Sequence, residues 1–364
     1  MNEEEQLLTL ALGHLRGLTQ QMALHLYRHY GSATAVFRHA EALEPKVRAT
    51  LGNAAEALRR AESELEFCAK KGIRVRCLAD ADYPQRLREC PDPPLCLFQY
   101  GPADLNARHI VAVVGTRRIT EYGKDLCARF CEDLSRLVPG VLVVSGLAYG
   151  VDIHAHRAAL ANGLPTLAVL AHGLDRIYPT LHRDTARQML EQGGLVTEYY
   201  TGTIPDKGNF VRRNRIVAGL SDAAVIVESA DHGGALITAR LAQDYNREIF
   251  AFPGRTSDPY SAGCNALIRN NGAALITSAA DLAEALRWGS GPQGAQPVQR
   301  ELFPTLSPDE EKICGLLAQT ESQSVNQLAL AANLPVHVVS AALFELELQG
   351  LVRELAGGRF RLLR

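Results

Sequence analysis

The sequence lacks the features that mark membrane, secreted and metal-bound proteins. No apolar run in its 364 residues approaches the roughly 20 that a membrane span requires. The N-terminus is acidic and has no basic start of the kind that a signal peptide carries. The eight cysteines are scattered singly, and Cys127 and Cys131 have no second pair with which to complete a zinc site. We therefore expect a cytoplasmic protein with reduced thiols and no bound metal.

Recognisable catalytic motifs are absent too. The chain contains neither the G-x-S-x-G elbow of hydrolases nor the H-E-x-x-H pair of zinc proteases. His154 and His156 lie two positions apart on a predicted helix, so they face opposite sides and cannot share a metal. The loop after the first predicted parallel strand, GTRRITEYG, is not the G-x-G-x-x-G dinucleotide fingerprint. We expect no catalytic residue and no cofactor.

Composition is that of an ordinary globular protein. Hydrophobic residues make up 47% of the chain, and the length suits two or three domains. The net charge of −2 argues against a surface coated with cations for nucleic acid, although a local basic patch fits it.

The hydrophobic pattern predicts a different architecture for each part of the chain. Residues 1–65 carry apolar residues at three- and four-residue spacing, typical of a small helical module of the SAM-like or helix-hairpin-helix-like kind. The segment LRGLTQ between two of these helices is compatible with a purely structural role and with a DNA contact, and both alternatives stay open. In residues 66–288, apolar runs rich in Val and Ile alternate with amphipathic segments. That pattern predicts an α/β domain with a Rossmann-like, doubly wound, mostly parallel sheet.

The C-terminal part of the sequence predicts a linker and a winged helix. Residues 289–304 have the Gly, Pro and Gln content of a linker. Within 305–364, Ser307 is placed to cap a helix, two more helices follow, and two strands flank Gly357-Gly358. The third helix, PVHVVSAALFELELQG, has no Lys or Arg. This favours a protein-contact or structural role over binding of the helix in a DNA groove. The arginines of the hairpin leave a phosphate contact by the wing open.

Residues that follow the predicted strands are candidates for binding, because ligands of open parallel sheets lie beyond the carboxyl ends of the strands. These residues are Gly115, Thr116, Arg117 and Arg118 after one strand, Ser145 and Gly146 after the next, and Gly233 and Gly234 after a later one. Glycine amides, hydroxyls and guanidinium groups together suit phosphate. The loops therefore indicate a polyanion.

The stretch NFVRRNRIVAGL predicts a helix with arginines in its first turn and a buried second half. Arg212, Arg213 and Arg215 would strengthen the positive field of a helix start, which favours a bound anion there. A structural alternative stays open, in which Asp152 or Glu228 pairs with an arginine.

An aromatic residue is interleaved with these cations. Lys207 and Phe210 immediately precede the arginines, a combination that suits a single-stranded nucleic acid. Phosphates would pair with the cations and a base would stack on the ring. In the alternative, Phe210 packs into the hydrophobic core and anchors its helix there.

Taken together, the motifs resemble the DprA/Smf family. The resemblance rests on VVGTRRITEYG, VVSGLAYGVDIHAHRAAL, GLDRIYP, NFVRRNRIVAGLSDAAVIVES, GGALITARLA, IFAFPG and SAGCNALIRNNGA, in this order. It implies single-stranded DNA binding, dimerisation through the Rossmann-like domain, and loading of RecA onto incoming DNA during natural transformation, without catalysis. The DNA-contacting candidates are Gly115, Thr116, Arg117, Arg118, Ser145, Gly146, Lys207, Phe210, Arg213, Asn214 and Arg215, with the glycine pair Gly233 and Gly234.

Some positions depart from the family pattern. His232 and Ala235 stand where the family commonly has serines, Val211 follows Phe210 in place of proline, and His182 lies near a customary asparagine. A hydroxyl contact from the loop that contains His232 and Ala235 is therefore not expected.

Two other functions compete. Rossmann-like enzymes of the Lonely Guy type process nucleoside monophosphates with the motif P-G-G-x-G-T-x-x-E. The nearest stretch here, DHGGALITAR, ends in Arg240 and lacks that glutamate, although Glu198 and Glu228 lie near strand ends. A structural adaptor with internally paired arginines is the other alternative.

Overall fold

The computed structural model describes residues 2–52, 54–288, 306–320, 322–355 and 357–363. Within them the chain divides into two units, Met1–Asp281 (the sheet unit) and Leu282–Arg364 (the winged-helix unit). The predicted linker, 289–304, lies outside the described residues.

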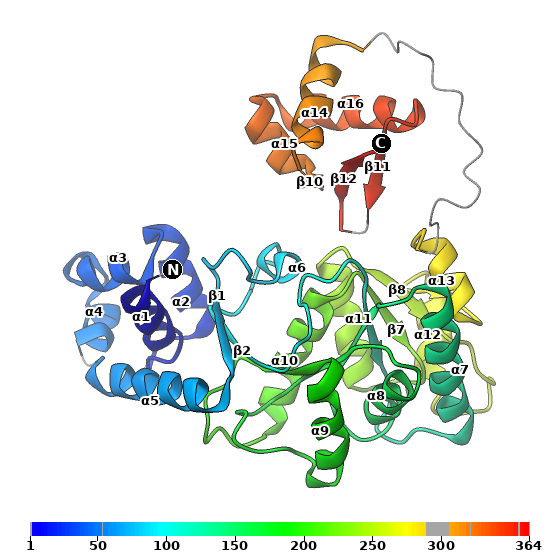
Figure 1. The fold of residues 1–364 in the computed structure, drawn as a ribbon, viewed down its shortest axis with the longest axis horizontal. Coiled ribbons are helices and arrows are strands. Elements are labelled where there is room, and N and C mark those ends of the chain that lie inside the picture. Colours follow the sequence, from blue (N-terminus) through cyan, green and yellow to red (C-terminus); the bar gives the residue numbers. More distant parts are fainter. Residues whose placement is uncertain (1, 53, 289–305, 321, 356, 364) are drawn as a thin grey trace. The chain divides into compact units, whose positions relative to one another are not determined.

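Five α-helices and a short 3-10 turn form the N-terminal part of the sheet unit. They are α1 (Glu3–Gly13), α2 (Gln20–Tyr30), α3 (Ala33–Arg38), the 3-10 turn η1 (Ala40–Ala42), α4 (Pro45–Gly52) and α5 (Ala55–Lys71). Thr19 and Ser32 cap the starts of α2 and α3 by accepting hydrogen bonds from backbone N–H groups. Helix α5 continues past residue 65, where we expected the module to end, and packs on the first strand of the sheet. The helices, blue in Figure 1, therefore form one unit with the sheet.

The central sheet has nine strands, seven of them parallel as predicted. The strands are β1 (Arg74–Cys77), β2 (Cys96–Tyr100), β3 (Ile110–Val114), β4 (Leu142–Ser145), β5 (Thr166–Val169), β6 (Gly194–Thr197), β7 (Ala223–Ile226), β8 (Glu248–Ala251) and β9 (Ala274–Leu275). Their order is β1-β2-β6-β5-β4-β3-β7-β8-β9. Strands β1 and β2 pair antiparallel with each other, and β2 pairs antiparallel with β6.

The chain winds outward from β3 in both directions. It first builds β4, β5 and β6 on one side and then returns to the other side for β7, β8 and β9. Helices α7 (Glu121–Leu137), α8 (Val151–Ala161) and α9 (Arg183–Gln192) cover one face, and α10 (Lys207–Leu220) and α11 (Gly234–Asp244) cover the other (Figure 1). The neighbouring strands β3 and β7 thus mark the point where the strand order reverses, which is where such sheets bind ligands.

Burial explains why the strands read as continuous apolar runs. All five residues of β3 are buried, as are all four of β4, β5, β6 and β7, because helices cover both faces. Short elements complete the unit: α6 (Gln85–Arg88), the 3-10 turn η2 (Thr180–His182) and α12 (Ala262–Arg269). Helix α13 (Ala279–Ala285) contains the boundary between the two units.

The winged-helix unit has the predicted three helices and hairpin. Its elements are α14 (Pro308–Ala318), β10 (Gln323–Ser324), α15 (Val325–Ala332), α16 (Val336–Leu348), β11 (Val352–Leu355) and β12 (Arg359–Leu362). Ser307 caps α14 as predicted and forms a reciprocal capping box with Glu310. Gly357 and Gly358 both have positive φ, of 87° and 66°, which the hairpin turn between β11 and β12 requires.

Among the described residues, no helix on its own combines the length and the apolar composition of a membrane span. Helices α15 and α16 reach that length and composition only jointly, across a bend of 112°.

Candidate nucleic-acid interface

A cavity of about 1030 Å³ opens at the carboxyl ends of β3, β4 and β7. We call it the switch-point cavity, because it lies where the strand order reverses. It brings together ten of the thirteen predicted site residues, which come from four separate segments of sequence, and Tyr178 adds a fifth segment to the lining. These ten are Gly115, Thr116, Arg117, Gly146, Lys207, Phe210, Arg213, Asn214, Gly233 and Gly234.

Helix α10 begins earlier than its arginines suggested. It starts at Lys207, and the Oδ1 atom of Asp206 caps it by accepting a hydrogen bond of 3.0 Å from the backbone N–H of Asn209. The prediction that the arginines occupy the first turn is therefore wrong, since Arg212, Arg213 and Arg215 lie in the second and third turns. The partial positive charge at the start of the helix is already balanced by the Asp206 carboxylate. The prediction of a buried second half is confirmed, because all residues from 215 to 220 are buried.

Arg213 forms part of the cavity wall. Its Nη1 atom donates to the carbonyl oxygens of Gly146, at 2.7 Å, and of Val169. Burial lowers the pKa of Arg213, and the attraction of Asp152 opposes this shift. A side chain at Gly146 would overlap the guanidinium group, so only glycine lets the loop after β4 approach it. Arg213 thus fixes the loop backbone, and the N–H groups of its Nε and Nη1 atoms are already bonded within the protein.

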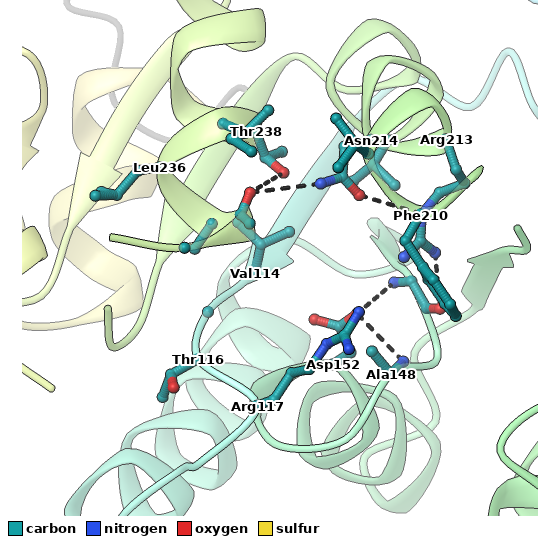
Figure 2. A pocket seen from close by; sticks show the side chains of 18 of the residues that line it. Val114, Thr116, Arg117, Ala148, Asp152, Phe210, Arg213, Asn214, Leu236 and Thr238 are labelled. Carbon is teal, nitrogen blue, oxygen red and sulfur yellow. Dashed lines mark hydrogen bonds between the residues drawn. The ribbon is translucent and has the colours of Figure 1, made fainter. Parts of the chain in front are cut away.

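Asp152 holds the same loop from the other side. Its Oδ2 atom accepts hydrogen bonds from the backbone N–H groups of Gly146, at 3.1 Å, and Ala148, at 3.3 Å (Figure 2). Burial raises the pKa of Asp152, and the nearby Arg213 opposes this shift. Loop shape is therefore set by two buried charged groups from two different helices.

An aromatic and cationic stack lies beside this loop. The guanidinium carbon of Arg117 lies 5.0 Å from the centroid of the Phe210 ring, and Figure 2 shows both side chains at the cavity. The ring of Tyr178 lies beside that of Phe210, with centroids 5.9 Å apart and the ring planes tilted by 51°. Phe210 is half-buried and lines the cavity, so it is not packed into the core of its helix. It can offer a ring face to a planar ligand once Arg117 moves aside.

The start of α11 forms another part of the cavity wall. This helix begins at Gly234 with no side chain capping its first turn. Asn214 joins it to α10 through a hydrogen bond of 3.4 Å from Nδ2 to the carbonyl oxygen of Gly234. The uncapped N–H groups suit an anion.

Three predicted residues do not line this cavity. Ser145 is fully buried, and its hydroxyl donates to the carbonyl oxygen of Val113 at 2.7 Å. Arg118 is exposed and does not line the cavity. Arg215 is buried and pairs with Glu198, with 2.5 Å between Nη2 and Oε2, so the predicted partners Asp152 and Glu228 are both replaced.

Glu228 has a structural task of its own. Its carboxylate accepts hydrogen bonds from the backbone N–H of Thr120, at 2.9 Å, and from the Thr120 hydroxyl, at 2.5 Å. It therefore supports the start of α7 and presents no free carboxylate to the cavity.

The cavity also contains residues that the sequence did not single out. Tyr178 lies within the quoted motif GLDRIYP, but nothing in its spacing indicated contact with Phe210. Among the described lining residues, the cations Arg117, Lys207, Arg213 and Arg240 are matched by four aspartates, Asp152, Asp206, Asp231 and Asp244. The cavity therefore combines amides, rings and a few free cations, without a strong excess of positive charge.

Comparison with known proteins identifies the family. The model for DNA recombination-mediator protein A matches residues 74–287, and the model for the DprA winged helix domain matches residues 297–358. Protein Smf of Escherichia coli (strain K12) is 40% identical over 296 residues, which are 79% of this chain and 77% of that protein.

Two solved structures have a similar fold. DNA processing protein A (DprA) from Streptococcus pneumoniae matches with 31% identity and a TM-score of 0.63, covering 76% of this chain and 95% of that one. The second is DNA processing protein A from Helicobacter pylori, whose structure was described for its single-stranded DNA binding mode. It matches with 31% identity and a TM-score of 0.53, covering 59% of this chain and 95% of that one. The chain therefore belongs to the DNA recombination-mediator protein A family, as its motifs predicted.

Proposed function

We propose that this chain binds single-stranded DNA in the switch-point cavity and acts, without catalysis, as a recombination mediator. One observation carries the proposal: five distant segments bring an aromatic ring, uncapped helix amides and free cations to one cavity at the point where the strand order reverses. This combination suits a flexible strand whose bases are unpaired. The similar protein from Helicobacter pylori, described for its single-stranded DNA binding mode, supports the same ligand.

A base is proposed to stack on Phe210. Arg117 lies over the ring at 5.0 Å in the structure, so it would move aside and become free to meet a neighbouring phosphate. Stacking of a base on an aromatic side chain contributes about 1–3 kcal/mol and tolerates any base. Selectivity for a single strand follows, because a paired base within a duplex cannot expose its face to the ring.

Phosphates are proposed to meet Lys207, Arg117 and the first N–H groups of α11. Lys207 is exposed at the start of α10, and α11 has no side-chain cap. Arg213, Ser145 and Arg215 are not proposed as direct contacts, because all three are buried and donate hydrogen bonds within the protein.

The finer biological role is proposed from the family. The protein would protect incoming single strands, load RecA onto them during natural transformation, and act as a dimer formed through the sheet unit. The non-catalytic part of the proposal is supported by the two carboxylates near the strand ends, since Glu198 pairs with Arg215 and Glu228 supports α7. Release of free base from a nucleoside monophosphate by the purified protein would favour the Lonely Guy-type enzyme instead.

The test uses fluorescence anisotropy with a labelled oligonucleotide, single-stranded or duplex. The parent should prefer the single strand, and Phe210→Ala should weaken binding by about 5- to 150-fold, the equivalent of the lost stacking. Phe210→Trp, which keeps a ring, is the matched variant and should retain binding. Equal binding of the parent to duplex, or full binding by folded Phe210→Ala, would contradict the proposal.

RecA loading and dimerisation need separate measurements. RecA filament formation on a strand coated with single-strand binding protein should accelerate when this protein is added. Light scattering should give a dimer mass for the full chain. Failure of either would remove that part of the role and leave DNA binding untouched.

A further inference from the structure

A second cavity, of about 520 Å³, lies between the N-terminal helices and the sheet. We call it the α1–α10 cavity. Its walls come from α1, α2, the segment 92–96, the end of β6 and α10. Helix α10 separates the two cavities: it contributes Arg213 and Asn214 to the switch-point cavity, and Arg212 and Arg215 to this one. Among the described residues none lines both cavities, and the volume suits a nucleoside-sized ligand.

Half of the residues that line the α1–α10 cavity are apolar, and half are polar or charged. Leucine and proline side chains from three segments form most of the apolar part: Leu10, Leu18, Leu24, Pro93, Pro94 and Leu95. Aliphatic and proline walls suit a flat ring, because both of its faces gain contact and neither needs a hydrogen bond. An apolar wall that lies beside convergent polar groups can hold a small molecule by its ring faces and by its polar edge.

A buried carboxylate with an unused acceptor lies at this cavity. The Oε2 atom of Glu198 accepts from Arg215 Nη2 at 2.5 Å and from Gln20 Nε2 at 2.9 Å. Its Oε1 atom is buried and has no hydrogen-bond partner among the described residues. An unpaired carboxylate oxygen away from water is costly, so an N–H donor brought by a ligand would stabilise the complex.

The charges around the cavity restrict the ligand further. Two arginines, Arg212 and Arg215, are balanced by two acids, Asp92 and Glu198. This balance gives no net attraction to a phosphate or to an amine. Arg212 is exposed, and one of its Nη atoms donates to Asn209 Oδ1 at 2.7 Å, so other N–H groups of its guanidinium can meet an acceptor. A neutral ring that carries a donor next to an acceptor fits this set.

We propose that the α1–α10 cavity binds a nucleobase through an edge on which a ring N–H adjoins a carbonyl. Glu198 Oε1 would accept the ring N–H, and Arg212 would donate to the carbonyl oxygen. Guanine, hypoxanthine, thymine and uracil carry this edge, and adenine does not. The base can come from a free nucleoside or from a single strand that crosses α10. The site does not depend on DNA binding in the switch-point cavity.

The first test is calorimetric titration of the full chain with guanosine, with adenosine as the chemical control. Guanosine should bind at least about tenfold more tightly, because its ring N–H and carbonyl can meet Glu198 and Arg212 together, whereas adenosine has neither a ring N–H nor a carbonyl and offers only an exocyclic amino group beside a ring nitrogen. Absence of guanosine binding at millimolar concentration, or equal binding of the two nucleosides, would overturn the proposal.

Variants assign the binding to this cavity. A Cβ atom at Gly13, which lines the cavity, would contact only Leu95, at 3.7 Å, so Gly13→Leu should fold and fill the space. Gly13→Leu and Glu198→Gln should each weaken guanosine binding by about tenfold or more. Phe210→Ala, in the other cavity, should leave it unchanged. Unaltered guanosine binding by Gly13→Leu with a parental melting temperature would contradict the assignment.

Oligonucleotides distinguish the two sources of the base. If a strand supplies it, the parent should bind oligothymidine more tightly than oligodeoxyadenosine, and Gly13→Leu should remove that preference while retaining binding to oligodeoxyadenosine. A preference that survives in Gly13→Leu would assign the cavity to the free nucleoside. If the parent binds no oligonucleotide, the proposed function is overturned, but the guanosine measurement still supports a nucleobase site in the α1–α10 cavity.

Discussion

Arg117 and Lys207, but not Arg215, should set the salt dependence of single-strand binding. Arg117 is exposed and lies over Phe210, and Lys207 is exposed at the start of α10. Arg215 lies outside the switch-point cavity and is held by Glu198 at 2.5 Å and by the carbonyl oxygen of Asp92 at 2.6 Å. Its charge is therefore not available to displace a counterion from DNA.

The magnitude follows from the number of phosphates that the free cations neutralise. Each phosphate contact on a single strand contributes a slope of about −0.7 to the logarithm of the binding constant against the logarithm of salt concentration. About two contacts give a slope of about −1.4, so the affinity should fall about sevenfold between 50 and 200 mM salt. With a third contact from Arg215, the fall would be about 18-fold.

The assay is anisotropy titration at four salt concentrations for the parent, Arg117→Gln and Arg215→Gln. The Arg117 variant should have a slope of about −0.7 and the Arg215 variant should keep the parental slope. Arg215→Gln should instead lower the free energy of unfolding by about 3–5 kcal/mol, because Glu198 is left buried without its partner. A folded Arg215 variant whose slope falls to half or two thirds of the parental value would refute the reasoning.

Three further predictions concern stability. Gly146→Ala should lower the free energy of unfolding by about 1–3 kcal/mol, because the new methyl group would overlap the Arg213 guanidinium that two carbonyls hold in place; Gly52→Ala, whose Cβ would meet no atom within 4 Å, is the control in urea unfolding. Burial lowers the pKa of His156 to about 3, so its neutral form stabilises the fold above pH 6.5 and this contribution is lost as the pH falls towards 3. His156 should contribute about 2 kcal/mol to the loss of stability between pH 7 and pH 5, so His156→Leu should lose about that much less than the parent, and an equal drop in both would assign the effect elsewhere. Ser307→Ala should destabilise the winged-helix unit by about 1 kcal/mol, because α14 loses its cap, and the thermal melt of that unit should shift to lower temperature. Ser307→Asp, which keeps a capping oxygen, should retain most of the parental stability.

The sequence by itself determined the fold class and most element positions. Buried parallel strands must be apolar on both faces, so the runs that became β3 to β8 stand out without any knowledge of their partners. Capping is equally local, since Ser307 and the backbone it caps are three residues apart. The ordered motifs then placed the glycine loops at the carboxyl ends of the strands, where the switch-point cavity lies.

Only the tertiary structure decided what each charged residue does. Arg213 and Arg215 are two positions apart, so they leave α10 on different sides, and their tasks depend on what packs there: the loop after β4 for one and Glu198 for the other. The sequence prediction put the start of α10 too close to the three arginines, because a single Asp206 is only a weak local signal for a helix N-terminus. Contact between Arg117 and Phe210, and the α1–α10 cavity itself, join segments far apart in the sequence. Such pairings depend on how the chain returns upon itself, which no local pattern of residues records.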